Sequence, residues 1–122
     1  MKNLEQIRAK NAWEAASNPE KFKGKNEGET VKKVPTMIRD NGLLGAPAFA
    51  MENSDRYKEI FEAIIKHLQD ENVQRYPGQN RCTLEEFFKY LTEHDSATLR
   101  DITSETMAYL NYLRRFVHKS EK

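Results

Sequence analysis

Apolar side chains recur at steps of three and four residues through the last long stretch of the chain, residues 99–117. The members of this stripe are Leu99, Ile102, Leu110, Leu113, Phe116 and Val117, with Met107 and Tyr109 widening it. Because an α-helix has 3.6 residues per turn, this spacing places them on one face of a helix of about five turns. So wide an apolar face needs other helices to cover it, and the stripe therefore predicts the centre of a helical core.

A shorter helix is predicted at the start of the chain, from Asn3 to about Ser17. The Asn3 side chain can cap it, because asparagine accepts hydrogen bonds from the free N–H groups at a helix start. Pro19 ends it, because the residue before a proline disfavours helical backbone. The predicted inner face consists of Leu4, Ile7, Ala12, Ala15 and Ala16, with Trp13 at its edge.

A charged connector, residues 18–29, is expected to be flexible, because it holds two glycines and a single large apolar side chain. A second helix is predicted from near Thr30 to Asn41, with Val31, Val34, Met37 and Ile38 on its inner face. Pro35 either begins this helix proper or kinks it, and both interpretations stay open. Gly42 is predicted to end the helix, because glycine adopts a left-handed backbone without steric cost.

The remaining segments are helical patterns separated by turn residues. Residues 43–51 form the most continuous apolar run, and Pro47 and the lack of a partner strand favour a short buried helix over a strand. A further helix over residues 55–70 has an inner stripe of Tyr57, Ile60, Phe61, Ile64, Ile65 and Leu68. A loop with a proline–glycine turn follows it.

Two more helix starts are marked by capping residues. Thr83 and Glu86 form a capping box, in which each side chain accepts the backbone N–H of the other residue. Asp95 and Ser96 cap the last helix. The patterns together predict an all-α fold, with one compact domain of five or six helices over residues 1–122, in which 18–29 is the flexible connector and 71–82 a loop.

The composition is that of a globular protein, with 122 residues of which 38% are hydrophobic and 32% charged. No apolar run approaches the roughly 18 residues of a membrane span. The N-terminal segment lacks the apolar stretch of a signal peptide, so we expect a cytoplasmic protein without membrane contact. The single cysteine, Cys82, agrees with this location because it can form no internal disulfide.

The net charge of +1 gives no overall attraction to nucleic acids, but the charges are unevenly distributed. Residues 20–39 hold six basic and three acidic side chains, and residues 106–122 hold four and one. Residues 84–105 hold six acidic and two basic ones. This division predicts either a two-faced surface placed between unlike partners or ordinary solvated helix faces.

The sequence contains no recognisable catalytic motif. His67, His94 and His118 are isolated, without the spacing that places two imidazoles on one helix face, and we expect them at the surface or its boundary. Cys82 precedes a helix start, which favours a thiolate, but no histidine lies near it in sequence to act as a base. No phosphate loop occurs either, so we predict no metal, no cofactor and no enzymatic activity.

Basic side chains remain as candidates for binding, because arginine and lysine pair with phosphates. They are Arg8, Lys32, Lys33, Arg39, Arg114 and Arg115. For the last three, stabilisation of a helix C-terminus through its dipole is a sufficient alternative explanation. With a net charge near zero, we expect weak affinity for free RNA or DNA and a larger role inside an assembly.

Three segments of the chain resemble one known family. The string VPTMIRDNGL of residues 34–43, followed by the small apolar APAFA of residues 46–50, resembles a signature of the small α-helical subunit of the type III-B CRISPR effector, the Cmr complex. Arg8-Ala9 and the closing segment 95–116, with its ending Leu-Arg-Arg-Phe, occur in the matching order. The resemblance covers nearly the whole chain apart from 18–29 and 71–82.

The resemblance implies a non-catalytic scaffold. In that family, copies of the small subunit stack into a filament beside the repeated backbone subunits that hold the CRISPR RNA, and cleavage chemistry belongs to other subunits. The implied partners are the backbone subunit, the large subunit, copies of the chain itself, the CRISPR RNA and the target RNA. By carry-over, Arg39, Arg114 and Arg115 are the first candidates for facing RNA or the backbone filament, and Lys32, Lys33 and Arg8 come next.

Two other functions stay open. A helical protein–protein adaptor with no nucleic-acid role would use an exposed apolar groove around residues 43–51. An enzyme would require a buried histidine paired with Cys82 or with a carboxylate.

Overall fold

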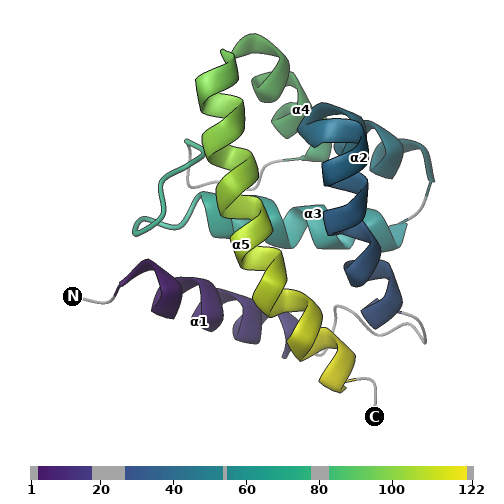
Figure 1. Ribbon diagram of the computed structural model, residues 1–122, viewed down its shortest axis with the longest axis vertical. Helices are drawn as coiled ribbons and strands as arrows, with labels where there is room; N and C mark the ends of the chain where they lie inside the picture. Colours follow the sequence, from purple (N-terminus) through teal and green to yellow (C-terminus); the bar gives the residue numbers. More distant parts are fainter. Residues whose placement is uncertain (1–2, 18–26, 54, 78–82, 121–122) are drawn as a thin grey trace.

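The computed structural model describes residues 3–17, 27–53, 55–77 and 83–120, and these form five helices and no strand (Figure 1). The helices are α1 (Leu4–Ala16), α2 (Glu27–Asn53), α3 (Asp55–Leu68), α4 (Leu84–Glu93) and α5 (Ser96–Ser120). The predicted all-α fold, built as a single compact domain, is confirmed.

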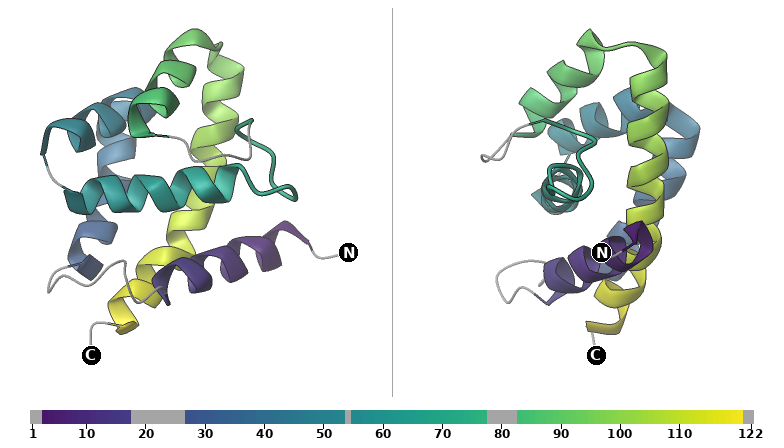
Figure 2. Two further views of the ribbon diagram at one scale, coloured as in Figure 1. Left: turned by 180° about the vertical axis from the view of Figure 1, so that it is seen from behind. Right: turned by 90° about the vertical axis from the view of Figure 1, so that its left-hand side faces the viewer.

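Helix α5 crosses the molecule from end to end, and α1, α2 and α3 all pack against it (Figures 1 and 2). Its predicted apolar stripe is the centre of the core, since Ile102, Leu110 and Leu113 have no exposed surface. Helix α3 supplies the facing layer through Ile60, Phe61, Ile64 and Leu68, which are equally buried. Helix α4 closes the core over α2 and α3.

The helix starts that the sequence predicts are present. The Asn3 side chain accepts a hydrogen bond from the backbone N–H of Gln6 at 2.9 Å, and the Gln6 side chain accepts one from the backbone N–H of Asn3. Thr83 and Glu86 make the predicted reciprocal pair at the start of α4. At the start of α5, Asp95 accepts the N–H of Thr98 at 2.9 Å. Local sequence therefore fixes where these three helices begin.

Helix α2 consists of two helical segments that are separated at Gly42, as predicted, and only its start differs from the prediction. It begins at Glu27, so residues 27–29 of the predicted connector are helical, while residues 18–26 lie outside the described residues. Gly42 interrupts it with φ 77° and ψ 170°. The positive φ was expected, but the backbone is extended rather than left-handed helical, and a second helical segment follows at once. The break lies at Gly42 rather than at Pro35, which stands within the helical part.

The apolar run 43–51 is helical, as predicted, and turns most of its surface inward. Leu43, Ala46 and Ala50 are buried, whereas Leu44 and Phe49 are 37% and 40% exposed. The Phe49 ring packs edge-on against Tyr57, with ring centroids 5.5 Å apart. The core therefore takes up the inner side of this run, whereas Leu44 lies beside a shallow groove between α2 and α5.

The loop predicted over residues 71–82 is described up to residue 77, where it consists of turns; Cys82 and the glycine of its proline–glycine turn lie outside the described residues. Tyr76 returns to the core and packs against Phe87 and Tyr90, at 5.1 and 4.7 Å between ring centroids. None of the described helices combines the length and the apolar character that a membrane crossing requires.

Candidate functional site

The basic side chains of α2 lie on the surface. Lys32, Lys33 and Arg39 are exposed, and the Arg39 side chain is 72% exposed. Arg39 contacts the acidic side chain of Asp40 at 3.8 Å between Nε and Oδ1, which is a long contact for an ion pair. Lys32 and Arg39 are seven residues apart and so share one side of the helix, about 10 Å from each other along its axis.

The basic side chains of α5 divide between two sides of the helix. Arg115 is exposed and lies two residues after the buried Leu113, so it points away from the core. Arg114 is half-buried and donates to the Oδ1 atom of Asn111 at 3.3 Å. Arg100 lies on the same side as Arg114, because fourteen residues are close to four whole turns.

Arg100 lines a shallow groove between α2 and α5, together with Gly42 and Leu43. Arg100 was not among the predicted basic candidates, because it falls within the acidic segment 84–105. The spacing of fourteen residues between Arg100 and Arg114, which places both on one side of a helix, would have identified it.

Arg8 differs from the other five candidates, because it is committed to an ion pair inside the protein. Its Nε and Nη2 atoms both donate to the carboxylate of Glu105, each at 2.8 Å, and its side chain is only 18% exposed. The remaining guanidinium nitrogen, Nη1, donates to the carboxylate of Glu5 at 2.8 Å. This two-pronged bond joins α1 to α5, and it leaves Arg8 little freedom to reach an external phosphate.

His67 is buried at the same junction, so the expectation that it lies at the surface or its boundary is wrong. It is 2% exposed, and its ring stacks on Tyr109 with centroids 4.3 Å apart. The Nε2 atom is 2.9 Å from Glu105, and the Nδ1 atom is 2.9 Å from the amide nitrogen of Asn11. Because that amide nitrogen can only donate, Nδ1 accepts and Nε2 donates its proton to Glu105.

The junction keeps Glu105 ionised. Burial raises the pKa of Glu105, but the hydrogen bonds from Arg8 and His67 outweigh burial and lower that pKa to about 2. The bond to Glu105 likewise raises the pKa of Arg8. A carboxylate held this far from neutral pH is a poor proton carrier, so the pair of His67 and Glu105 has the character of a structural contact.

The sequence contains a signal for this junction, because a charged and a titratable side chain occupy apolar positions of their helices. Glu105 follows Ile102 by three residues and precedes Tyr109 by four, so it falls on the apolar face of α5. His67 follows Ile64 by three residues on α3 in the same way. A charged and a titratable side chain in core register need partners inside the protein.

His94 is exposed at the end of α4, with its Nδ1 atom 2.7 Å from the carbonyl oxygen of Tyr90. The side chain of His118 lies outside the described residues. Within the part of the chain that the structure describes, no group of three histidine, cysteine, aspartate or glutamate side chains is arranged to hold a metal ion.

Comparison with known proteins gives two matches. The family model of the CRISPR-associated protein Cas_Cmr5 matches residues 4–119. The crystal structure of a CRISPR-associated Cmr5 family protein from Thermus thermophilus superimposes with a TM-score of 0.73 at 23% sequence identity, and the match covers 97% of each chain. Among curated proteins, no significant match was found.

Proposed function

Since this chain belongs to the Cmr5 family, the small subunit of the type III-B CRISPR effector, we propose that it acts there as a non-catalytic scaffold. It stacks with copies of itself beside the backbone subunits that carry the CRISPR RNA, and it helps to retain the target RNA. The observation that carries this proposal is the family match over residues 4–119, which spans all five helices.

The proposed RNA-facing side chains are Lys32 and Arg39 on α2 with Arg100, Arg114 and Arg115 on α5. The exposure of Arg39 and its long contact to Asp40 support this role, because an exposed, loosely paired guanidinium loses little when it turns to a phosphate. Lys33 lies about a quarter of a turn from Lys32 and is the next candidate. Arg8 is left out, since its guanidinium is occupied by Glu105.

A scaffold without chemistry of its own also fits the buried polar junction. His67 and Glu105 have side chains that are 0% and 2% exposed, and Arg8 bonds both carboxylate oxygens. A substrate would have to displace Arg8 to reach them. The enzyme alternative therefore has no support from the histidine–carboxylate pair that the chain does contain.

The test is reconstitution of the effector from the backbone and large subunits, CRISPR RNA and this chain, with and without target RNA. Native mass spectrometry measures how many copies of the chain enter the complex. Several copies in a defined assembly are expected, and a complex that forms fully without this chain bound would refute the scaffold proposal.

The RNA contact is tested by Arg39→Glu, with Lys89→Glu as the matched control, because Lys89 is exposed on α4. We expect Arg39→Glu to enter the complex normally and to weaken target-RNA retention. The slope of log affinity against log salt concentration should become shallower by roughly 0.7 for each lost phosphate contact. Equal RNA retention by the two variants would remove Arg39 from the interface.

A further inference from the structure

A large apolar side chain stands out from the surface of α1. Trp13 is 57% exposed, the highest value among the large hydrophobic side chains in the described part of the chain. Its neighbours one helical turn away are the small Ala9 and Ala16, so little on α1 covers the indole. Phe116 of α5 packs edge-on against it, with ring centroids 5.2 Å apart and ring planes at 89°. This contact holds the indole in place and leaves much of its surface to a partner.

A groove with apolar residues in its lining lies between α2 and the first turns of α5. Its volume is about 580 Å³, which is room for a large side chain. Leu44 and Leu99 supply part of its apolar lining, and Leu44 is 37% exposed. Arg100 lines the same groove, and so do Ser96 and Ser104, whose hydroxyl groups can accept a hydrogen bond.

The exposed indole and the groove cannot meet within one chain. Phe116, which contacts Trp13, follows Leu99 by seventeen positions on α5, so about 25 Å of helix separates the two features. In Figure 1, α1 lies across the lower part of α5, whereas α5 begins at the top of the molecule. A contact between the two features therefore joins one end of a molecule to the opposite end of another, and it can be repeated from copy to copy.

We propose that Trp13 of one copy of this chain docks in the groove between α2 and α5 of the next copy. Leu44 and Leu99 cover the apolar indole, and a serine hydroxyl of the groove accepts its N–H. Arg100 suits this occupant, because the face of an indole attracts a guanidinium more strongly than any other aromatic side chain does. A guanidinium stacked on a ring keeps the N–H donors at its edge, so Arg100 can still meet a phosphate. The inference rests on the proposed stacking of copies and names the two surfaces that perform it.

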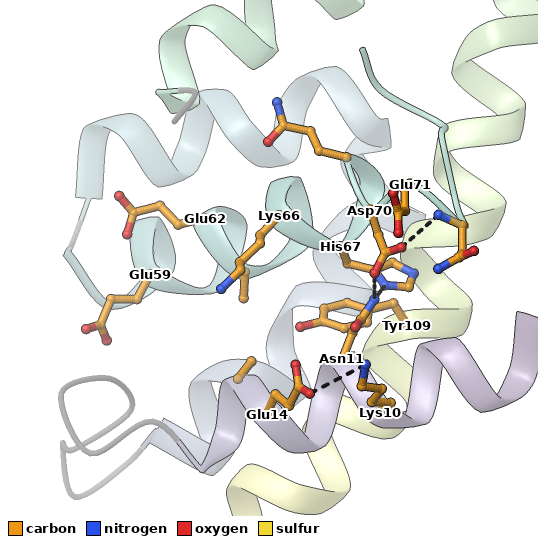
Figure 3. A pocket seen from close by; sticks show the side chains of 14 residues that line it. Lys10, Asn11, Glu14, Glu59, Glu62, Lys66, His67, Asp70, Glu71 and Tyr109 are labelled. Atoms are coloured by element: carbon orange, nitrogen blue, oxygen red, sulfur yellow. Dashed lines mark hydrogen bonds and ion pairs between the residues drawn. The ribbon is translucent and has the colours of Figure 1, made fainter. Parts of the chain in front are cut away.

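The surroundings of Trp13 favour a protein partner over RNA. Helix α1 holds two acidic and two basic side chains, so it has no excess of positive charge to attract phosphates. Lys10 and Glu14, which flank Trp13, contact each other at 3.9 Å (Figure 3). Exposed tryptophans are also typical of the centres of protein interfaces. Because Arg115 precedes Phe116 on α5, a nucleotide base stacked on Trp13 is the alternative that the experiments distinguish.

The first experiment measures self-association of the isolated chain. Trp13 is the only tryptophan in the sequence, so its fluorescence reports the proposed contact directly. Sedimentation equilibrium and quenching by acrylamide are followed from micromolar to millimolar concentration. The average mass should rise, and the quenching constant should fall about twofold as the indole enters the groove. A chain that stays monomeric, or one that associates while Trp13 remains equally accessible, would overturn the proposal.

Two variants each remove one half of the contact. Trp13→Ala removes the indole, and Leu44→Glu places a charge in the groove. Both change exposed side chains, so both should give the circular dichroism spectrum of the parent, and neither should associate with itself. Thr92→Glu, an exposed change on α4 outside the groove, should associate as the parent does.

A mixture of the two variants tests whether the contact joins unlike surfaces. Trp13→Ala keeps the groove and Leu44→Glu keeps the indole, so an equal mixture should form dimers but no longer assemblies. The fluorescence of the mixture comes from Leu44→Glu alone and should be shielded from acrylamide. A mixture that stays monomeric would contradict a contact between indole and groove.

The reconstituted complex shows which partner Trp13 meets there. Trp13→Ala and Leu44→Glu should each lower the number of copies in the assembly, while each copy that enters retains target RNA normally. A full number of copies with weakened RNA retention by Trp13→Ala would assign the indole to a nucleotide base and refute the contact between copies. Failure of these variants to change the assembly leaves the scaffold proposal standing, because that proposal fails only if the parent chain itself is not needed in the complex.

Discussion

Replacing Glu105 by glutamine tests whether the buried junction between α1, α3 and α5 stabilises the fold. Glutamine keeps the size of the side chain but removes the charge that pairs with Arg8 and accepts the proton of His67. Arg8, at 18% exposure, would then have little contact with water and would keep only Glu5 as a carboxylate partner. Breaking a buried pair from one side is among the most costly single substitutions.

The magnitude follows from the pKa of Glu105, which falls from 4.5 to about 2 on folding. Each pKa unit corresponds to about 1.4 kcal/mol, so ionised Glu105 contributes roughly 3 kcal/mol at pH 7. Because the folded pKa is the lower one, this stability is fully present above pH 4.5 and is lost as the pH falls towards 2. At pH 3 about 1.4 kcal/mol of it should remain.

Urea unfolding followed by circular dichroism gives the free energy of unfolding of the parent and of Glu105→Gln at pH 7, 5, 4 and 3. The difference in free energy of unfolding between the parent and the variant should become smaller as the pH falls, as calculated above. Glu93→Gln, an exposed change of the same kind, should differ little from the parent at every pH. A deficit below about 1 kcal/mol at pH 7, or one that does not depend on pH, would refute the reasoning.

Two further substitutions test how the helices are delimited. Gly42→Ala should lower the free energy of unfolding by about 1–3 kcal/mol, because φ 77° with ψ 170° is strained for any residue with a Cβ atom. The loss would come from the backbone alone, since the added atom would meet nothing within 4 Å. Urea unfolding measures the loss, and an unchanged midpoint would show that the kink relaxes without cost. Thr83→Ala should cost about 1 kcal/mol by removing the cap of α4. Thr92→Ala, at the other end of the same helix, serves as its comparison and should cost clearly less, so equal losses would contradict a specific capping role.

The parts of the fold that were predicted correctly are those encoded by neighbours in sequence. The stripe on α5 and the capping pairs at Asn3, Thr83 and Asp95 depend on residues within one or two turns. The break at Gly42 and the helical segment after it were also predicted correctly, and only the start of α2, at Glu27 rather than near Thr30, was predicted wrongly.

Local periodicity could not predict the polar junction, because Glu105 lies 38 residues from His67 and 97 residues from Arg8. Sequence patterns identified Arg8 as a basic residue, and only the fold identifies its carboxylate. The exposure of Arg39 and Arg115 agrees with their place on the polar sides of predicted helices. Whether they contact RNA is a property of the assembly, so it stays a prediction for the reconstituted complex.

The pairing of α1 with α5 has a consequence for the order in which the protein is made. Glu105 follows its partner Arg8 by 97 positions, so at ribosomal speeds α1 waits roughly 5–20 s for the helix that covers it. The side chains that α1 finally buries are Ile7, Ala12 and Ala16, two of them among the smallest apolar residues. The burial of such small side chains supplies little apolar driving force for the docking of the nascent helix. Its docking is instead specified by a charge pair that exists only when the last helix has emerged, so the finished surface is presented to partners only by complete chains.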